Sequence, residues 1–222
     1  MENCVFCDKS QFEERLCGET KDFWIIATLG QITDGGYLLL VPKRHVDCVG
    51  AMRINEIRNL ILLMNNTART QRDLYRNLNI EWDKCALDQC TIFEHGVVGQ
   101  TIKHAHIHIM PQRPHSLHIE QRIKKDFPQC KIEYLPLEKL IKLYRLRKTP
   151  YLYWQEPAWD DFPSGGFKVC WNPPAPLQYM RIVIADALGR PERANWRNMD
   201  PGLDKKLWSE TVKRLKPYFA SK

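Results

Sequence analysis

Apolar positions in the first half of the chain follow strand-like and helix-like spacings in turn. Residues 22–29 and 37–42 are two short apolar runs joined by a glycine-containing turn, which predicts a pair of strands. Between residues 54 and 78, apolar side chains recur at intervals of three and four opposite a charged face, as in an amphipathic helix. Residues 90–96 and 103–111 predict two further strands. We therefore expect an α+β fold in which these strands pair in one antiparallel sheet.

The pattern becomes polar and basic after Pro111, as expected of a linker or surface loop. Beyond it, the spacing predicts a short basic helix at residues 136–148 and a strand pair at residues 150–156 and 165–171. A helix that stops at Gly189 follows, and a last helix is predicted at residues 203–219. The expected organisation is a domain at residues 1–113, a linker or surface loop at 114–135, and a mixed α/β C-terminal extension at 136–222, which could act as a cap.

The composition is that of a protein able to bury a core, with 44% hydrophobic and 27% charged residues. No apolar run reaches the ~18–20 residues of a transmembrane helix. The N-terminus lacks the layout of a signal peptide, so we expect a cytoplasmic protein with no membrane partner. The net charge of +7 favours anionic partners such as nucleotides, polyphosphates or nucleic acid.

Three of the seven histidines, His104, His106 and His108, fall at alternate positions of the strand expected at 103–111. Alternate side chains of a strand share one face at a spacing of about 6.6–6.8 Å, so the three rings would form one polar row. Three interpretations of such a row are open: an exposed polar face, a set of metal ligands, or a row of catalytic residues. The row is too long for all three rings to bind one ion.

A catalytic row fits the neighbouring residues best. Neutral imidazole is a good nucleophile toward phosphorus when a hydrogen bond fixes its second nitrogen. The preceding loop contains Gly96 and Gly99, where backbone N–H groups can approach phosphate oxygens. The row and the loop together indicate phosphate chemistry.

Cys4 and Cys7 form a C-x-x-C pair, whose spacing suits two of the four ligands of tetrahedral zinc. Two buried thiols or a redox pair are the alternatives, although a redox pair usually opens a helix that follows a strand. The chain has eight cysteines and no secretion signal, which favours free thiols or metal ligation over disulfides. Most of the other six are expected to be small buried residues.

These blocks resemble the histidine triad (HIT) family. The segment GQTIKHAHIHIMP, residues 99–111, is similar to the signature His-φ-His-φ-His-φ-φ preceded by Gly-Gln-Ser/Thr, where φ is apolar. The segment GYLLLVPKRH, residues 36–45, is similar to the landmark Gly-x-x-Leu-Val-Ile-Pro-Lys-x-His. The resemblance covers about residues 1–113. It implies a five-stranded antiparallel sheet with helices, often dimeric, that hydrolyses or transfers nucleotides at the α-phosphate.

The resemblance also implies roles for individual residues. His106 would be the nucleophile that forms a nucleotidyl-histidine intermediate, and His108 would contact the phosphate. Gln100 and Thr101 would hydrogen-bond the phosphate or the leaving group, next to Gly99. The uridylyltransferase and diadenosine-tetraphosphate phosphorylase branches have glutamine at the position of His108, which places this chain with the hydrolase-type members.

Many bacterial-type members of the family carry the N-terminal C-x-x-C as half of a zinc site. The His of Pro-Lys-x-His and the first His of the triad complete it. Carried over to this chain, the resemblance implies a structural zinc ion held by Cys4, Cys7, His45 and His104. Zinc would fix the N-terminus to the sheet and contribute folding energy.

Two positions depart from the family pattern. His95 stands where commoner members have asparagine, and we expect it to contact substrate; a replaced zinc ligand or a plain loop residue are the alternatives. Many members bind ribose with an acidic residue where this chain has Leu29 or Gly30, and Asp34 lies nearby but further along. The nucleoside preference is therefore open.

The C-terminal extension lies outside the resemblance. Gln178 and Arg181 are three residues apart and would share a helical face. We favour a solvated or ion-paired face for Arg181 and Lys168 over a phosphate contact. The aromatic residues are expected to pack in the core and the hairpin, with stacking on a base as the alternative; they are Tyr151, Tyr153, Trp154, Trp159, Trp171, Trp196 and Trp208.

The leading hypothesis is an enzyme, a zinc-containing nucleotide hydrolase or nucleotidyl transferase of HIT type acting through His106. Its substrate would be a dinucleoside polyphosphate, an adenosine phosphoramidate or a related nucleotidyl conjugate, and a homodimer is possible. The second hypothesis, aprataxin-like removal of adenylate from nucleic-acid ends, rests on the basic charge, and the lack of a second C-x-x-C…H-x-H finger weighs against it. The third is a non-catalytic nucleotide-binding module.

Overall fold

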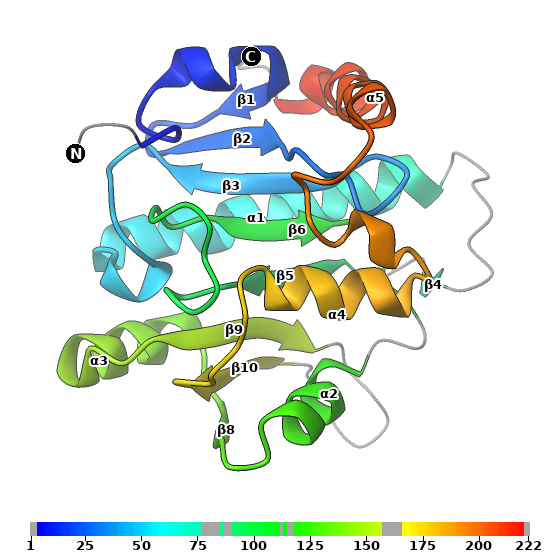
Figure 1. Ribbon diagram of the computed structural model, residues 1–222. Helices are drawn as coiled ribbons and strands as arrows, with labels where there is room; N and C mark the ends of the chain where they lie inside the picture. Colours follow the sequence, from blue (N-terminus) through cyan, green and yellow to red (C-terminus); the bar gives the residue numbers. More distant parts are fainter. Residues whose placement is uncertain are drawn as a thin grey trace.

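The computed structural model describes residues 4–76, 85–86, 90–111, 113–114, 118–156 and 166–219 (Figure 1). Within them, one eight-stranded sheet has the order β1-β2-β3-β6-β5-β9-β10-β8, and its neighbouring strands are antiparallel. The strands are β1 (Leu16–Glu19), β2 (Phe23–Ala27), β3 (Leu38–Pro42), β5 (Thr91–Glu94), β6 (Ile107–Met110), β8 (Ile132–Tyr134), β9 (Tyr151–Glu156) and β10 (Gly166–Trp171). A separate ladder pairs β4 (Cys85–Ala86) with β7 (Arg113–Pro114).

Helices cover both sides of the sheet. They are α1 (Ile54–Arg76), α2 (Ile119–Asp126), α3 (Leu137–Arg147), α4 (Tyr179–Ala187) and α5 (Pro201–Phe219), with single 3-10 turns η1 (Lys9–Gln11), η2 (Glu13–Arg15), η3 (Val49–Ala51) and η4 (Pro191–Arg193). Across the described ranges, no helix has the length and apolar character needed to cross a membrane. Residues 77–78 of the predicted long helix and Trp159 lie outside the described residues.

The first five strands in the sheet order are the antiparallel sheet that the resemblance implies, so the predicted α+β class is confirmed. Four of them match the predicted apolar runs; β1 contains Gly18 and Glu19 and has no such run. The other three strands belong to the C-terminal extension. They continue the same sheet because β5 pairs with β9, where Phe93 lies opposite Trp154.

The segment 114–135, expected to be a linker or surface loop, contains α2 and the edge strand β8. Ile119 and Ile123 are one helical turn apart and both are buried, so the isolated apolar positions of this basic segment anchor a helix. The division of the chain into domains stays a prediction.

Side-chain alternation sorts the central strands onto two faces. Leu40 of β3 and Ile107 of β6 join the larger core, together with residues of α1 and α3. Leu39 and His108 alternate with them and lie on the opposite face, where Leu39 packs with Phe6 and α4 covers the strands (Figure 1). The functional face of the sheet is therefore enclosed by the N-terminal segment and the C-terminal extension.

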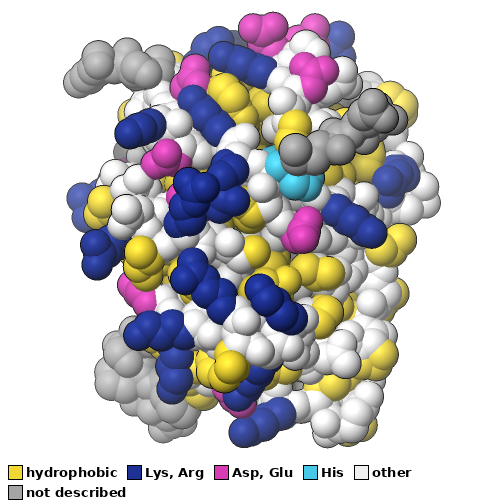
Figure 2. All heavy atoms as spheres, turned by 90° about the vertical axis from the view of Figure 1, so that its left-hand side faces the viewer, with side chains coloured by type: hydrophobic (Ala, Val, Ile, Leu, Met, Phe, Trp, Pro, Cys, Tyr) yellow, Lys and Arg dark blue, Asp and Glu magenta, His cyan; other side chains and the backbone are white. Residues whose placement is uncertain are grey.

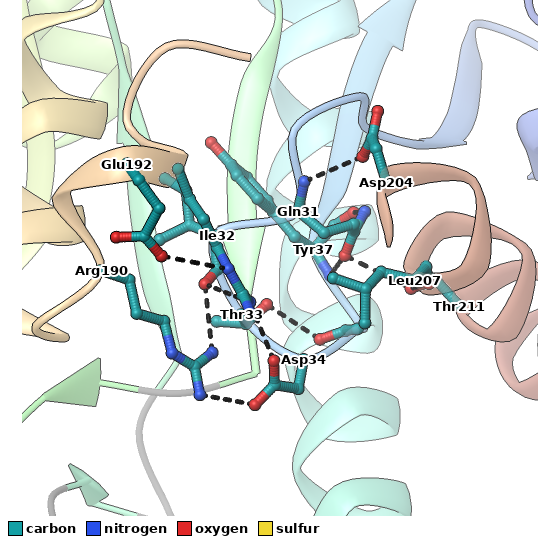
Figure 3. Close-up of polar contacts among 12 residues, drawn as sticks. Gln31, Ile32, Thr33, Asp34, Tyr37, Arg190, Glu192, Asp204, Leu207 and Thr211 are labelled. Atoms are coloured by element: carbon teal, nitrogen blue, oxygen red, sulfur yellow. Dashed lines mark hydrogen bonds and ion pairs between the residues drawn. The ribbon is translucent and has the colours of Figure 1, made fainter. Parts of the chain in front are cut away.

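The extension also holds the loop between β2 and β3 (Figure 3). The Asp204 carboxylate accepts hydrogen bonds from the backbone N–H groups of Gly30 and Gln31, at 2.8 and 3.3 Å. The Arg193 guanidinium pairs with Asp34 at 2.8 Å. The loop is fixed by residues more than 150 positions away in the sequence, since the Asp204–Gly30 bond alone spans 174 residues.

Candidate functional site

Two thiols and two imidazoles gather beside the N-terminal segment. Cys4, Cys7, His45 and His104 place one ligand atom each within 4.8 Å of one another. His104 Nδ1 is 3.4 Å from Cys4 Sγ and 3.6 Å from Cys7 Sγ, and His45 Nδ1 is 3.2 Å from Cys7 Sγ. Tetrahedral zinc with Zn–S of about 2.3 Å and Zn–N of about 2.0 Å separates its ligand atoms by roughly 3.3–3.8 Å. Three ligand-atom pairs of the cluster are therefore close to the separations found in a four-ligand metal site.

The ring of His104 is oriented for this role from its other side. Its Nε2 lies 2.8 Å from the carbonyl oxygen of Pro42. A carbonyl can only accept, so Nε2 carries the proton and Nδ1 presents its lone pair to the cluster. Such outer hydrogen bonds are typical of histidines that bind metals. Two thiolates and two imidazoles are also a donor set that zinc prefers.

His106 lies beside this cluster and lines a cavity of ≈ 250 Å³. Its Nδ1 donates to the carbonyl oxygen of His104 at 2.6 Å, which leaves the lone pair on Nε2. Burial lowers the pKa of His106 to about 4, so the ring is neutral at pH 7. The structure thus presents a buried, neutral imidazole with a fixed tautomer.

His108 is the second histidine in the cavity. Its ring stacks on Phe93 at 4.3 Å between centroids and lies 4.8 Å from the ring of His106. Its Nδ1 is 2.7 Å from the Tyr37 hydroxyl oxygen, and its Nε2 is buried without a hydrogen-bond partner in the described part of the chain. When the hydroxyl donates this bond, the proton of neutral His108 is on Nε2, as a donor for a ligand. Burial lowers the pKa of His108 well below its ordinary value.

The three histidines are not one row on one strand, because β6 begins only at Ile107. The segment before it is held by other bonds: Ala105 N–H donates to the carbonyl oxygen of Val46 at 2.6 Å. The rings of His104 and His106 therefore diverge. His104 is completely buried in the Cys/His cluster, while His106 lines the cavity.

His95 is a third histidine of the cavity wall. Its Nε2 accepts a hydrogen bond from the backbone N–H of Met180, at the start of α4, at 3.2 Å. The proton of the neutral ring is then on Nδ1. Burial lowers the pKa of His95 to about 3. His95 is not one of the four clustered ligands, and its contact with a substrate stays a prediction.

Comparison with known proteins decides the family. Residues 10–115 match the family model described as the HIT domain. Residues 10–115 form a HIT domain. No curated protein sequence matches the chain.

Solved structures similar to the chain include other HIT proteins. A hypothetical histidine triad nucleotide-binding protein from Sulfolobus tokodaii strain7 is 20% identical, with a TM-score of 0.38 over 49% of this chain and 68% of that one. A Zn-bound histidine triad family protein from Mycobacterium smegmatis is 22% identical, with a TM-score of 0.39 over 50% and 76%. A uridylyltransferase is 15% identical, with a TM-score of 0.36 over 82% of this chain and 74% of that one.

The glycine loop of the HIT domain lies at the same cavity. Gly99 and Thr101 line it, whereas Gln100 donates from its side-chain amide to the carbonyl oxygen of Asp47 at 2.9 Å. Gly99 has φ +71°, and a Cβ there would lie 2.7 Å from the carbonyl oxygen of Pro176, so glycine is required. The roles of these loop residues in binding a phosphate stay predictions.

Sequence reasoning missed part of the cavity, because Gln178, Arg181 and Trp196 of the extension line it together with the HIT domain. The solvated or ion-paired face favoured for Arg181 is wrong: this side chain is 3% exposed and makes no ion pair among the described residues. Lys168, by contrast, pairs with Glu120. The apolar neighbours of Arg181 in YMRIVIA were a signal that this arginine is buried.

The structure also locates the ribose-contact position and the aromatic residues that were singled out from the sequence. Leu29, which with Gly30 is one of the two positions where the resemblance implies an acidic ribose contact, lines the cavity, and Asp34 pairs with Arg193. Tyr151 and Trp154 are completely buried core residues, as expected of the extension's aromatics, whereas Trp196 is a cavity residue.

Proposed function

We propose that this chain is a nucleotide hydrolase or nucleotidyl transferase of HIT type that attacks the α-phosphate of a dinucleoside polyphosphate or nucleotidyl conjugate. The observation that carries the proposal is the state of His106. Its Nδ1–H is fixed on a backbone carbonyl oxygen, and its neutral ring lines a cavity beside a second buried histidine, His108. The HIT family, which consists mostly of nucleotide hydrolases and transferases, supports this assignment.

The reaction follows from that state. The lone pair of His106 Nε2 attacks phosphorus, the bond from phosphorus to the leaving group breaks, and the leaving group departs with the bonding electrons. The ring gains positive charge in the nucleotidyl-histidine intermediate, and the carbonyl oxygen of His104 stabilises that charge through Nδ1–H. Water or another acceptor then attacks phosphorus, the bond from phosphorus to Nε2 breaks, the ring leaves as neutral imidazole, and the proton of the acceptor passes to solvent. The N–H groups of His108 and His95 would donate to the non-bridging oxygens.

The cavity wall supports a nucleotide as the ligand. The histidines and the glycine loop form a polar end, suited to phosphate. The remaining wall combines polar residues with an apolar part that is suited to a base and a ribose. Its apolar residues are Val5, Phe6, Leu29, Leu39, Ile102 and Trp196.

Replacement of His106 tests the proposal. We expect His106→Ala to lower kcat by at least about a thousandfold across a panel of dinucleoside polyphosphates and nucleotidyl conjugates, because the covalent route is lost. The melting temperature should change little. His118→Ala is the matched control, since His118 is exposed and outside the cavity. Wild-type rates in His106→Ala would contradict the proposal. Nucleotide binding by the wild-type protein without any turnover would favour the non-catalytic module.

We also propose that the Cys/His cluster holds one structural zinc ion, with Cys4, Cys7, His45 and His104 as ligands. Bound zinc would fix the N-terminal segment, whose Phe6 ring packs 5.4 Å from the ring of His106. The metal would thus support the cavity without taking part in the chemistry.

Metal analysis tests the zinc proposal. We expect one zinc per wild-type chain, less than about 0.1 in Cys4→Ser/Cys7→Ser, and a melting temperature that falls when a chelator is added, because a ligand that binds only the folded state stabilises it. Cys130→Ser, a substitution away from the cluster, should retain the metal. A full zinc content in the double variant would contradict the assignment.

The nucleic-acid alternative gains little from the structure. Exposed Lys and Arg side chains lie along α3, but this helix packs on the sheet face opposite to the cavity. Figure 2 shows Lys and Arg side chains interspersed with acidic and apolar ones on the face it presents. Binding of an oligonucleotide with a steep salt dependence would revive this alternative. The homodimer stays a prediction.

A further inference from the structure

Arg181 lies in the cavity of the HIT domain although it belongs to the C-terminal extension. Its guanidinium is held by backbone carbonyl oxygens: Nε donates to Ala194 at 2.9 Å, and Nη2 donates to Gly30 at 2.8 Å and to Arg193 at 3.1 Å. Its Cζ also lies 5.4 Å from the centroid of the Tyr37 ring. The guanidinium is therefore fixed in place from both the extension and the β2–β3 loop.

The charge of Arg181 acts on Asp204 from beyond ion-pair distance: burial raises the pKa of that carboxyl overall, and the charge of Arg181 lowers it. Within the described ranges, no carboxylate lies within ion-pair distance of Arg181, and none of its guanidinium hydrogen bonds goes to an anion. A buried guanidinium costs free energy unless an anion compensates it. Arg181 lines the cavity, so the anion that it can pair with is a ligand.

Further polar groups line the same cavity. His108 has a buried Nε2 without a partner among the described residues, and His95 is fixed by α4 with its proton on Nδ1. The cavity also lies at the N-terminal end of α4, where the helix dipole favours negative charge. Two imidazole N–H donors, the end of α4 and the fixed Arg181 guanidinium thus border a cavity that His106 also lines.

We propose that Arg181 is a phosphate-binding residue of the HIT site, supplied by the C-terminal extension. Its guanidinium binds the phosphate oxygens of a nucleotidyl group while His106 attacks the phosphorus of that group. The extension is therefore part of the active site. This inference rests on the proposed function for the identity of the ligand. It adds a residue and a segment that lie beyond the matched HIT domain.

The test compares a nucleotide with its nucleoside, because the two differ only in the phosphate. We expect wild-type protein to bind AMP more tightly than adenosine in calorimetric titrations. Arg181→Met should weaken AMP binding roughly ten- to hundredfold, the value of a charged hydrogen-bonded contact, and leave adenosine binding within about twofold. Lys168→Met is the matched control, since Lys168 is a buried cation of the extension that pairs with Glu120 outside the cavity. Equal loss of AMP and adenosine binding, or no loss, would overturn the proposal.

Arg181→Met leaves three carbonyl oxygens without a donor and could impair folding. Arg181→Lys then serves instead: it retains the charge without the planar fork and should weaken AMP selectively. Crystals of wild-type protein soaked with AMP decide the point without any variant. Phosphate oxygens within hydrogen-bond distance of the Arg181 guanidinium support the proposal, and a phosphate bound elsewhere overturns it.

Thermal stabilisation by pyrophosphate alone separates this inference from the proposed function. If nucleotides fail to bind but pyrophosphate raises the melting temperature of wild-type protein and not of Arg181→Met, the anion site stands and the nucleotide substrate is wrong. If His106→Ala retains turnover while Arg181→Met loses its preference for AMP, the nucleophile is wrong and the phosphate contact stands.

Discussion

Tyr37 is linked to the tautomer of His108 through a hydrogen bond. Its hydroxyl lies 2.7 Å from Nδ1 of His108, and both side chains are buried. Without this bond, neutral His108 can place its proton on either nitrogen, and only the Nε2–H form presents a donor to a phosphate. The position of one proton therefore depends on a side chain that does not touch the substrate.

Tyr37→Phe is expected to lower kcat by about tenfold with little change in KM, because a positioning bond is lost while the cavity keeps its shape. Steady-state kinetics with the best substrate of the panel measures the effect. Tyr153→Phe is a matched control: the Tyr153 hydroxyl is buried without a hydrogen-bond partner in the described part of the chain, on the other face of the sheet. Its removal should leave kcat unchanged and stability equal or slightly higher. Equal kinetic losses in both variants would contradict the role of Tyr37.

Residue-level chemistry was readable from the sequence where a motif carried it. Cys4, Cys7, His45 and His104 meet as the resemblance implied, since a short C-x-x-C and two landmark histidines identify them. Arg181 could not be placed in the same way. Its position depends on how the extension packs against the β2–β3 loop, and no local pattern of a single sequence specifies such a long-range contact.

At the scale of elements, Glu94 joins three segments beneath the site. Its buried carboxylate accepts hydrogen bonds from Val49 N–H and from the Tyr151 hydroxyl, both at 2.7 Å, and that hydroxyl accepts one from Gly50 N–H. β5, η3 and β9 are thus tied together by one acidic residue. Burial raises the pKa of Glu94 to about 7, in spite of the two bonds that lower it.

This shift predicts a particular pH dependence. Between about pH 4.5, where an unfolded-chain glutamate ionises, and about pH 7, the folded chain holds a proton that the unfolded chain has released. Raising the pH through this window therefore lowers the free energy of unfolding, by up to about 3 kcal/mol from this group. Glu94→Gln should lack this fall, which urea unfolding at pH 5, 6 and 7 measures.

Glu120, a carboxylate whose pKa is lowered rather than raised, provides the control. The pKa of Glu120 is lowered by its bonds to Lys124 and Lys168, although burial opposes them. Its contribution to stability is lost only as the pH falls below the ordinary glutamate pKa, so Glu120→Gln should keep the wild-type slope between pH 5 and 7. An unchanged slope in Glu94→Gln would show that Glu94 does not titrate in this window.

The element boundaries show why pattern analysis succeeded for most of the sheet. β2, β3, β5 and β6 are short apolar runs, and each lies within its predicted range. β8 was missed because only Ile132 of its three residues is apolar and aliphatic, and its pairing with β10 supplies the stability. Tertiary pairing rather than local composition makes this strand.

At the scale of the whole molecule, the sheet is continuous from the HIT domain into the extension. β5 would be an edge strand without β9, and α5 packs against β1 and β2 at the other end of the sheet order. Leu207 and Leu215 of α5 are buried, as is most of α4. The extension therefore continues the HIT sheet at one end and packs against it at the other, while the predicted division of the chain into domains stays a prediction.

Truncation tests this continuity. We expect a chain of residues 1–113 to lack a cooperative thermal transition and to aggregate, because it exposes the β5 edge and the apolar face that α4 covers. Circular dichroism with temperature and analytical ultracentrifugation measure both properties. Adding a chain of residues 114–222 in trans should restore a transition if the missing pairing is the cause. A fragment 1–113 that melts cooperatively within a few degrees of the full chain would instead establish an independent domain, with the extension attached to its cavity only as a cap.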